Sequence, residues 1–203
     1  MDHNYFLNFE MQPESTLLVL GALDGDFIRE KKQEILKKNI TVINVEPNLN
    51  SFKDLLNFSN SQMPRNALIL NLAFSNKTGF AVFNNKQAPV LSCLNSIKEE
   101  KYGDCSGTFE FSKVMTISLD DFLSLWNVDY IICDIEGAEL DVFLNSKKIR
   151  EVSYYAIAAY HVVDGEETVH KLKNFFDTNN FITDVFIDSE RQDGTILYCE
   201  RKN

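Results

Sequence analysis

Short apolar runs alternate with amphipathic stretches along most of the chain. Apolar runs bounded by Gly, Pro, Asn or Asp are typical of buried strands, and apolar residues three and four positions apart are typical of helices that cover a sheet. This pattern predicts strands at residues 16–20, 40–45, 67–74, 80–83, 113–118, 129–134, 154–160, 181–187 and 195–200. It predicts helices at residues 27–38, 119–126, 138–145 and 166–178, and one that carries Phe52, Leu55 and Leu56 behind a cap at Asn50 or Ser51.

The order of these elements predicts an α/β fold in a single domain over residues 1–203. Repeated strand–helix units favour a doubly wound, mostly parallel sheet, and Asp193-Gly194 between the last two strands predicts an antiparallel C-terminal hairpin. Residues 80–83 are expected to pair back on the third strand across a turn at residues 76–79. The irregular residues 84–112 are long for a plain connection, which is typical of a lid or a flexible segment.

Composition narrows the choice of partners. The formal net charge of −10 disfavours nucleic acid, and the cluster formed by Lys31, Lys32, Lys37 and Lys38 fits a solvated helix face. No signal peptide opens the chain and no apolar run approaches a membrane span, so we expect a soluble, cytoplasmic protein without a membrane partner. The oligomeric state stays open. The cysteines form no Cys-x-x-Cys pair, so neither zinc nor a disulfide framework is indicated; they are Cys93, Cys105, Cys133 and Cys199.

The first strand ends in Gly21-Ala22-Leu23-Asp24-Gly25-Asp26. Two glycines four positions apart, between a strand and a helix, allow the backbone to approach a ligand closely. The segment is not Gly-x-Gly-x-x-Gly, which weakens a dinucleotide interpretation. Asp24 and Asp26 would repel a pyrophosphate and favour a ligand with a positive centre. A plain turn is the alternative.

The second strand ends at Glu46, 21 residues after Gly25. An acid at this position of a nucleotide-binding α/β fold accepts hydrogen bonds from the two ribose hydroxyls. Pro47 follows and keeps the chain extended. The alternative role of Glu46 is to support the start of the next helix.

A third group of polar residues follows the strand at 129–134. Asp134, Glu136 and Glu139 come directly after an apolar run, and Tyr160-His161 ends the next strand. Ligands of open α/β sheets bind outside the carboxyl ends of the strands, so we expect these acids to face a cleft. If the two strands are neighbours, His161 faces the same cleft. A solvated strand end with a helix cap is the alternative.

These segments resemble the FkbM-type S-adenosylmethionine-dependent methyltransferases over roughly residues 16–161. The resemblance is carried by Gly21 to Asp26, Val45 to Asn48, Ala73 to Gly79, Ser118 to Asp121 and, most specifically, Asp134-Ile135-Glu136-Gly137-Ala138-Glu139. It implies a Rossmann-like class I methyltransferase fold with seven core strands. It also implies methyl transfer from S-adenosylmethionine to oxygen, or less often nitrogen, of a small molecule or glycan.

The resemblance assigns roles to individual residues. The cofactor-binding residues it implies are Gly21, Ala22, Asp24, Gly25, Asp26, Glu46 on the ribose, Asn48, Ala73 and Phe74 near the adenine, and Asp134. A hydroxyl acceptor must lose a proton, so His161 is the expected base, with Asp134 and Glu136 as further catalytic residues. Metal assistance by Asp134, Glu136 and Glu139 is a weaker alternative, since no His or Asp pair stands at ligand spacing, and no metal is predicted.

One position departs from the family pattern. The family often has an acid two positions before Gly21, where this chain has Val19. That acid helps to hold the cofactor, so its loss leaves open a non-catalytic module that binds the cofactor or a partner. A nicotinamide-dependent oxidoreductase is a third hypothesis, disfavoured by the absent Gly-x-Gly-x-x-Gly.

Overall fold

The computed structural model describes residues 5, 9–63, 65–85, 93–94, 110–188 and 194–202. Most of the irregular segment at 84–112 lies outside the described residues, as does most of the turn before Gly194, so the expectation of a lid is not tested. No helix among the described residues has the length and apolar character needed to cross a bilayer.

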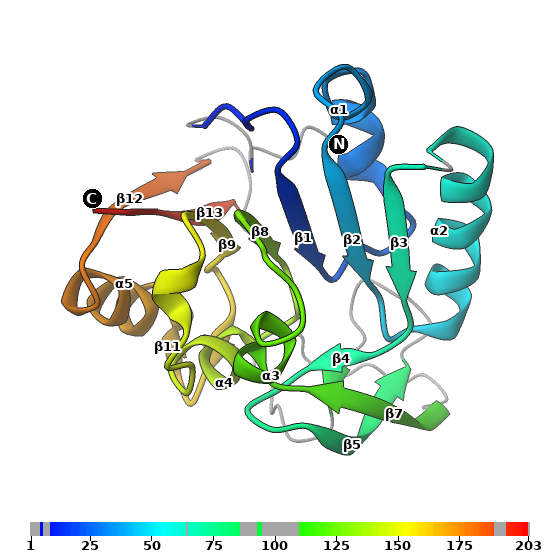
Figure 1. Cartoon of the computed structure of the whole chain (residues 1–203). Helices are drawn as coiled ribbons and strands as arrows, with labels where there is room; N and C mark the ends of the chain where they lie inside the picture. Colours follow the sequence, from blue (N-terminus) through cyan, green and yellow to red (C-terminus); the bar gives the residue numbers. More distant parts are fainter. Residues whose placement is uncertain are drawn as a thin grey trace.

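The core of the fold is a seven-stranded sheet in the order β12-β13-β9-β8-β1-β2-β3 (Figure 1). Five strands are parallel, β13 is antiparallel to both of its neighbours, and β12 and β13 form the predicted hairpin. This confirms the doubly wound sheet with an antiparallel C-terminal hairpin. The strands are β1 Thr16–Leu20, β2 Thr41–Val45, β3 Ala67–Leu70, β8 Tyr130–Cys133, β9 Tyr154–Ala158, β12 Phe181–Ile187 and β13 Thr195–Arg201.

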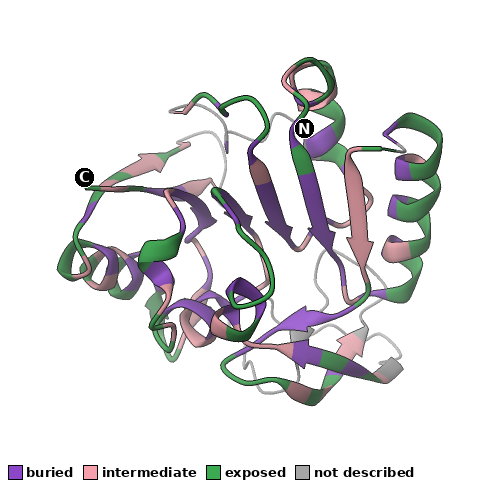
Figure 2. Cartoon of the chain, viewed as in Figure 1, coloured by how far each residue is buried: buried purple, intermediate pink, exposed green. Residues whose placement is uncertain are grey.

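Helices cover both faces of this sheet. On one face, α1 (Asp26–Lys37) and α2 (Leu49–Gln62) pack Ile28, Ile35 and Leu55 against β1 and β2. On the other face lie α3 (Leu119–Leu123), α4 (Glu139–Phe143), the 3-10 turn Ile149–Glu151 and α5 (Thr168–Thr178). The buried residues therefore lie in the central strands and on the inner side of each helix, whereas the edge strand β3 is intermediate in burial (Figure 2).

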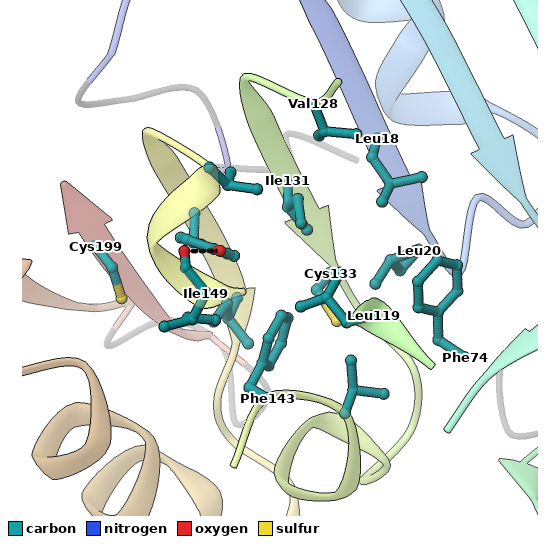
Figure 3. Packing of buried hydrophobic residues seen from close by; sticks show 14 of the residues in the cluster. Leu18, Leu20, Phe74, Leu119, Val128, Ile131, Cys133, Phe143, Ile149 and Cys199 are labelled. Carbon is teal, nitrogen blue, oxygen red and sulfur yellow. Dashed lines mark hydrogen bonds between the residues drawn. The ribbon is translucent and has the colours of Figure 1, made fainter. Parts of the chain in front are cut away.

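The larger core cluster lies on the face of α3, α4 and α5. Leu18, Leu20, Ile131 and Cys133 of the sheet lie on the same side as Phe143 of α4 (Figure 3). Every second residue of β1 and β8 contributes to this cluster, and the alternate residues contribute to the opposite face. A strand buried on both faces reads as a continuous apolar run, which is why the sequence pattern located these strands.

A second, smaller sheet lies beyond the carboxyl ends of β1, β2 and β3 (Figure 1). Its strands are β4 Ala73–Phe74, β7 Glu110–Ile117, β5 Gly79–Asn85 and β6 Cys93–Leu94. The prediction of one strand over residues 67–74 is therefore wrong, because β3 ends at Leu70. After Leu70, the side chain of Asn71 donates hydrogen bonds to the backbone carbonyls of Glu46 and Pro47, and the chain then enters the smaller sheet. The predicted partner of residues 80–83 is also wrong, since β5 pairs with β7.

Several predicted helix ends also need correction. Asn48, rather than Asn50 or Ser51, caps α2, because its side chain accepts hydrogen bonds from the backbone amides of those two residues. The predicted helices at 119–126 and 138–145 are shorter in the structure. The helix predicted from residue 166 begins at Thr168, since Glu166–Glu167 form β11 against β10 (Val162–Val163).

The position that matters for function is the tip of β1. This strand lies between β2 and β8, so the chain order reverses there, and open α/β sheets bind ligands at such a switch point. The segments that follow β1, β2, β8 and β9 all leave the carboxyl ends of parallel strands and so meet at one edge of the sheet.

Candidate active site

The loop after β1 is held tightly against its two neighbours. The amides of Gly21 and Ala22 both donate to the carbonyl of Val45, at 3.0 Å each. Gly21 has a φ of +77°, and a Cβ atom there would lie 1.8 Å from the carbonyl oxygen of Asp134. Gly21 therefore permits close approach to the chain itself, and it joins the tip of β1 to the tip of β8.

Glu46, at the tip of β2, binds this loop through its side chain. Its two carboxylate oxygens accept hydrogen bonds from the amides of Leu23 (2.9 Å) and Asn48 (2.7 Å), and only 5% of the residue is exposed. Burial raises the pKa of Glu46 to about 7, although the two backbone hydrogen bonds oppose the shift. The structure thus places Glu46 at the predicted tip, where its bond from Asn48 supports the start of α2, as the alternative interpretation expected. The bond from Leu23 was not expected from the sequence.

Arg29 of α1 changes the charge of the first loop. Its guanidinium lies 2.7 Å from Asp26 and 3.5 Å from Asp24, so it offsets the two carboxylates that the sequence placed at this loop. One oxygen of Asp24, Oδ1, is buried and has no hydrogen-bond partner among the described residues. That oxygen is a ready acceptor for a donor group on a ligand.

The remaining predicted cofactor residues lie nearby, with side chains turned to the protein. Asn48 is buried and caps α2. Ala73 belongs to a small apolar cluster with Ala138 and Ile135, which lie in the loop after β8. Phe74 packs into the main core against Phe122, at 5.2 Å between ring centroids. Contact of these residues with an adenine ring stays a prediction.

Asp134, directly after β8, is held by two tyrosine hydroxyls. Tyr5 donates to its Oδ2 at 2.8 Å, and Tyr160 donates to the same oxygen at 3.2 Å. Sequence reasoning missed Tyr5, because nothing in the local pattern links it to a residue 129 positions later. Tyr160 could be inferred from its place at the end of the next strand.

β8 and β9 are neighbours, so His161 lies beside the carboxylates, but its side chain is buried and does not face a cleft as expected. Its Nε2 is 3.8 Å from Asp134 Oδ1 and 3.7 Å from Glu136 Oε2, and its Nδ1 is 3.2 Å from Glu139 Oε1. The side chains of His161 and Glu139 have no exposed surface, whereas 28% of the Asp134 side chain and 17% of the Glu136 side chain are exposed. A ligand in solvent therefore meets the two outer carboxylates first.

The electrostatics of this group are dominated by its buried charges. Burial alone would lower the pKa of His161, but Glu139, Glu136 and Asp134 hold it well above its usual range. Burial would raise the pKa of Glu139, yet the nearby charge of His161 lowers it. Burial raises the pKa of Asp134 despite the opposing charge of His161. The imidazole is therefore an imidazolium that balances part of the surrounding negative charge.

Backbone geometry directs Glu136 into this group. Glu136 has a φ of +56°, which is uncommon for a residue other than glycine, and Gly137 follows with a φ of +92°. Such conformations persist where surrounding contacts enforce them, and they concentrate at functional sites. The amide of Ile135 donates to Glu139 Oε1 at 3.0 Å and so fixes the same turn.

The structure therefore brings the predicted residues together in two adjoining groups. After the roles that the sequence predicts for them, we name the Gly21–Gly25 loop with Glu46 the cofactor half, and Asp134, Glu136, Glu139 and His161 the acceptor half. They meet where the amide of Asp134 donates to the carbonyl of Leu20 at 3.0 Å. Ala73 lies beside the acceptor half through Ala138 and Ile135, whereas Phe74 points into the core.

Comparison with known proteins places this arrangement in a family. The family model of the methyltransferase FkbM domain matches residues 20–186. No curated protein sequence matches the chain.

Solved structures share the fold at low sequence identity. A methyltransferase FkbM from Methylobacillus flagellatus KT superposes with a TM-score of 0.64 at 14% identity, covering 96% of this chain and 45% of that chain. The chain thus spans less than half the length of that protein. A precorrin-6y C5,15-methyltransferase from Geobacter metallireducens GS-15 has a TM-score of 0.58 at 11% identity, covering 97% of this chain and 86% of that chain. TrmK from M. capricolum, in complex with S-adenosyl-homocysteine, has a TM-score of 0.52 at 9% identity, covering 95% and 65% respectively.

Proposed function

Because the chain belongs to the FkbM methyltransferase domain family, we propose that it transfers a methyl group from S-adenosylmethionine to a hydroxyl oxygen of a small molecule or glycan. The observation that carries the proposal is the acceptor half itself. Two partly exposed carboxylates, Asp134 and Glu136, stand directly beside the loop that follows β1.

The cofactor half has the donor and acceptor chemistry that this cofactor requires. S-adenosylmethionine carries ribose hydroxyls and a cationic amino group, which are hydrogen-bond donors. Glu46 supplies a carboxylate at the tip of β2, where such folds bind a ribose. The buried Oδ1 of Asp24 lacks a partner among the described residues and suits a donor of the cofactor.

When bound, the cofactor supplies an electrophilic methyl group: a C–O bond forms to the acceptor oxygen as the S–CH₃ bond breaks, and the electron pair stays on sulfur. The acceptor half provides alignment and a place for the hydroxyl proton. We assign the proton to Asp134, because its carboxylate is partly exposed and is fixed in place by the hydroxyls of Tyr5 and Tyr160.

His161 has a positioning role in this proposal, in place of the base role expected from sequence. Its ring has no exposed surface, so an acceptor reaches the carboxylates before it reaches Nε2. Its charge keeps Asp134, Glu136 and Glu139 together despite their mutual repulsion. An oxygen acceptor is favoured over nitrogen because a hydroxyl needs the proton acceptor that this half supplies.

The test is methyl transfer from methyl-labelled S-adenosylmethionine to a panel of hydroxylated metabolites and oligosaccharides, with products identified by mass spectrometry. Asp134→Asn should cut turnover by about 10²–10⁴-fold and leave cofactor affinity nearly unchanged. Asp141→Asn, on the helix that follows the same loop, is the matched control and should keep full turnover.

A non-catalytic module is the second candidate, and Val19 is the observation that favours it. Val19 is fully buried in β1, in register with Asn44 and Ile132, and offers no polar group to a cofactor. Calorimetric binding of S-adenosylmethionine without turnover on any acceptor would support this candidate. Absence of binding at millimolar concentration would contradict both.

A further inference from the structure

We propose that Asp134, Glu136 and His161 form a binding site for one divalent metal ion at the tips of β8 and β9. Each side chain offers one ligand atom, and the three atoms lie within 4.8 Å of one another. Nε2 of His161 is 3.8 Å from Asp134 Oδ1 and 3.7 Å from Glu136 Oε2. Neighbouring ligand atoms around a four-coordinate ion with bonds of about 2.1 Å are roughly 3.4 Å apart. Small side-chain adjustments are therefore enough to bind an ion.

The first support is the surroundings of His161. The ring is fully buried, and neither of its nitrogens has a hydrogen bond of good geometry among the residues that the structure describes. Nδ1 faces the buried carboxylate of Glu139 at 3.2 Å, and that carboxylate is itself fixed by the amide of Ile135. Histidines that bind metals usually donate the N–H of the other ring nitrogen to a carboxylate or carbonyl, which turns the lone pair to the ion. Glu139 is placed to do this.

The second support is the way Asp134 is held. Tyr5 donates to Oδ2, Tyr160 donates to both carboxylate oxygens, and Oδ1 lies 3.8 Å from Nε2 of His161. Two of the three proposed ligands are thus oriented by neighbours that do not themselves bind the ion. Such orientation is characteristic of metal sites in proteins.

The third support is the balance of charge. Three carboxylates surround one imidazole, so the group stays negative even with the imidazole protonated. A divalent cation in place of the Nε2 proton would compensate this charge. Two carboxylate oxygens and one imidazole nitrogen suit Mn²⁺, Fe²⁺ or Zn²⁺ better than Ca²⁺, which prefers oxygen ligands alone.

What the ion does rests on the proposed function, although its binding does not. Three protein ligands leave a position open on the side where Asp134 and Glu136 are exposed. A hydroxyl of the acceptor bound at that position loses its proton more readily, as metal-bound water does. With the ion bound, Asp134 would act as a ligand instead of the proton acceptor assigned above, and the proton would pass to solvent. No His or Asp pair stands at ligand spacing in the sequence, and the fold brings His161 to the carboxylates from the end of the next strand.

The test is titration of the purified full chain with Mn²⁺ alone, followed by the electron paramagnetic resonance signal of free Mn²⁺. We expect one ion bound per chain. Glu136→Gln should weaken binding at least about tenfold through loss of a ligand, and Glu139→Gln about 10–100-fold through loss of the support for His161. Glu30→Gln, an exposed carboxylate on α1, is the matched control and should leave the affinity unchanged.

Circular dichroism establishes that each variant is folded before it is titrated. The proposal is overturned if folded wild-type protein binds no Mn²⁺ at millimolar concentration, or if Glu136→Gln binds it as tightly as wild type. Binding without methyl transfer on any acceptor would contradict the proposed function and leave the metal site standing. Methyl transfer that survives a chelator, together with no Mn²⁺ binding, would contradict the metal site and leave the proposed function standing.

Discussion

Glu46 at the tip of β2 and Glu139 after β8 are both buried carboxylates, but they are held by different kinds of partner. Glu46 accepts hydrogen bonds from two backbone amides of residues close to the switch point. Glu139 accepts one amide and faces a buried histidine from another strand. The pKa of Glu46 is raised by burial, whereas the pKa of Glu139 is lowered because the imidazolium outweighs burial.

Glu46 is therefore held by the dipoles of backbone amides, whereas Glu139 is held by the charge of the imidazolium. Backbone amides hold the cofactor half in shape without adding net charge. The acceptor half depends on one imidazolium, so its geometry is tied to the charge at a single position. Substitutions in the two halves should therefore change the free energy of unfolding by different amounts and with different pH dependence.

The largest effect is expected where the two halves touch. Gly21→Ala would place a Cβ atom 1.8 Å from the carbonyl of Asp134, so we expect a loss of at least about 5 kcal/mol in the free energy of unfolding. Gly165→Ala is the matched control, since Gly165 has a similar φ of +79° but open space around it. It should cost only about 1 kcal/mol. Urea denaturation measures both, and equal losses would mean that contact between the halves is unimportant.

Removing the imidazolium should be nearly as costly. His161→Leu leaves Glu139 buried without its counter-charge, which should lower the free energy of unfolding by about 3–5 kcal/mol. Adding Glu139→Leu should restore much of that loss, because no buried charge then remains at this position. A double-mutant cycle in urea measures the coupling. Additive losses from the two changes would contradict an electrostatic role for His161.

Glu46 should have a smaller effect on the free energy of unfolding, and this effect should depend on pH because the pKa of Glu46 is raised rather than lowered. Its pKa in the folded chain is about 7, above the ordinary 4.5, so its contribution to stability is complete below pH 4.5 and is lost as pH rises through 7. We expect that contribution to fall by about 3 kcal/mol over this range. Glu46→Gln stays neutral and should lack this component in urea titrations, whereas Glu30→Gln should behave as wild type. A Glu46→Gln profile parallel to wild type would contradict the raised pKa.

The last expected effect tests the proposed cofactor role of Glu46. Ribose hydroxyls donate to an ionised carboxylate, so affinity for S-adenosylmethionine should rise about tenfold per pH unit up to about pH 7 and then level off. Isothermal titration calorimetry of wild type and Glu46→Gln at several pH values measures this. A pH-independent affinity in the wild type would confine Glu46 to its role in holding Leu23 and Asn48.

Features that depend on residues close together in the sequence could be predicted, whereas features that depend on tertiary contacts could not. Most strands of the large sheet, and the strand ends near Gly21, Glu46 and Asp134, follow from local apolar runs bounded by Gly, Pro, Asn or Asp, and the structure confirms them. The small sheet did not follow, because two residues after β3 redirect the chain without an obvious signal. The contact of Tyr5 with Asp134, the pairing of Arg29 with Asp24 and Asp26, and the packing of His161 on Glu139 depend on tertiary approach, which no spacing in the sequence encodes.

The insertion of β13 between β9 and β12 has a consequence for synthesis of the chain on the ribosome. Every residue of β9 is buried, and one edge of this strand is paired only by β13, whose residues are translated long afterwards. At about 5–20 residues per second, that edge stays open for several seconds after β9 leaves the ribosome. An open apolar edge is a template for pairing with other chains. Truncation before Thr195 should therefore yield aggregated nascent protein, even though the residues of both halves of the site would already be present.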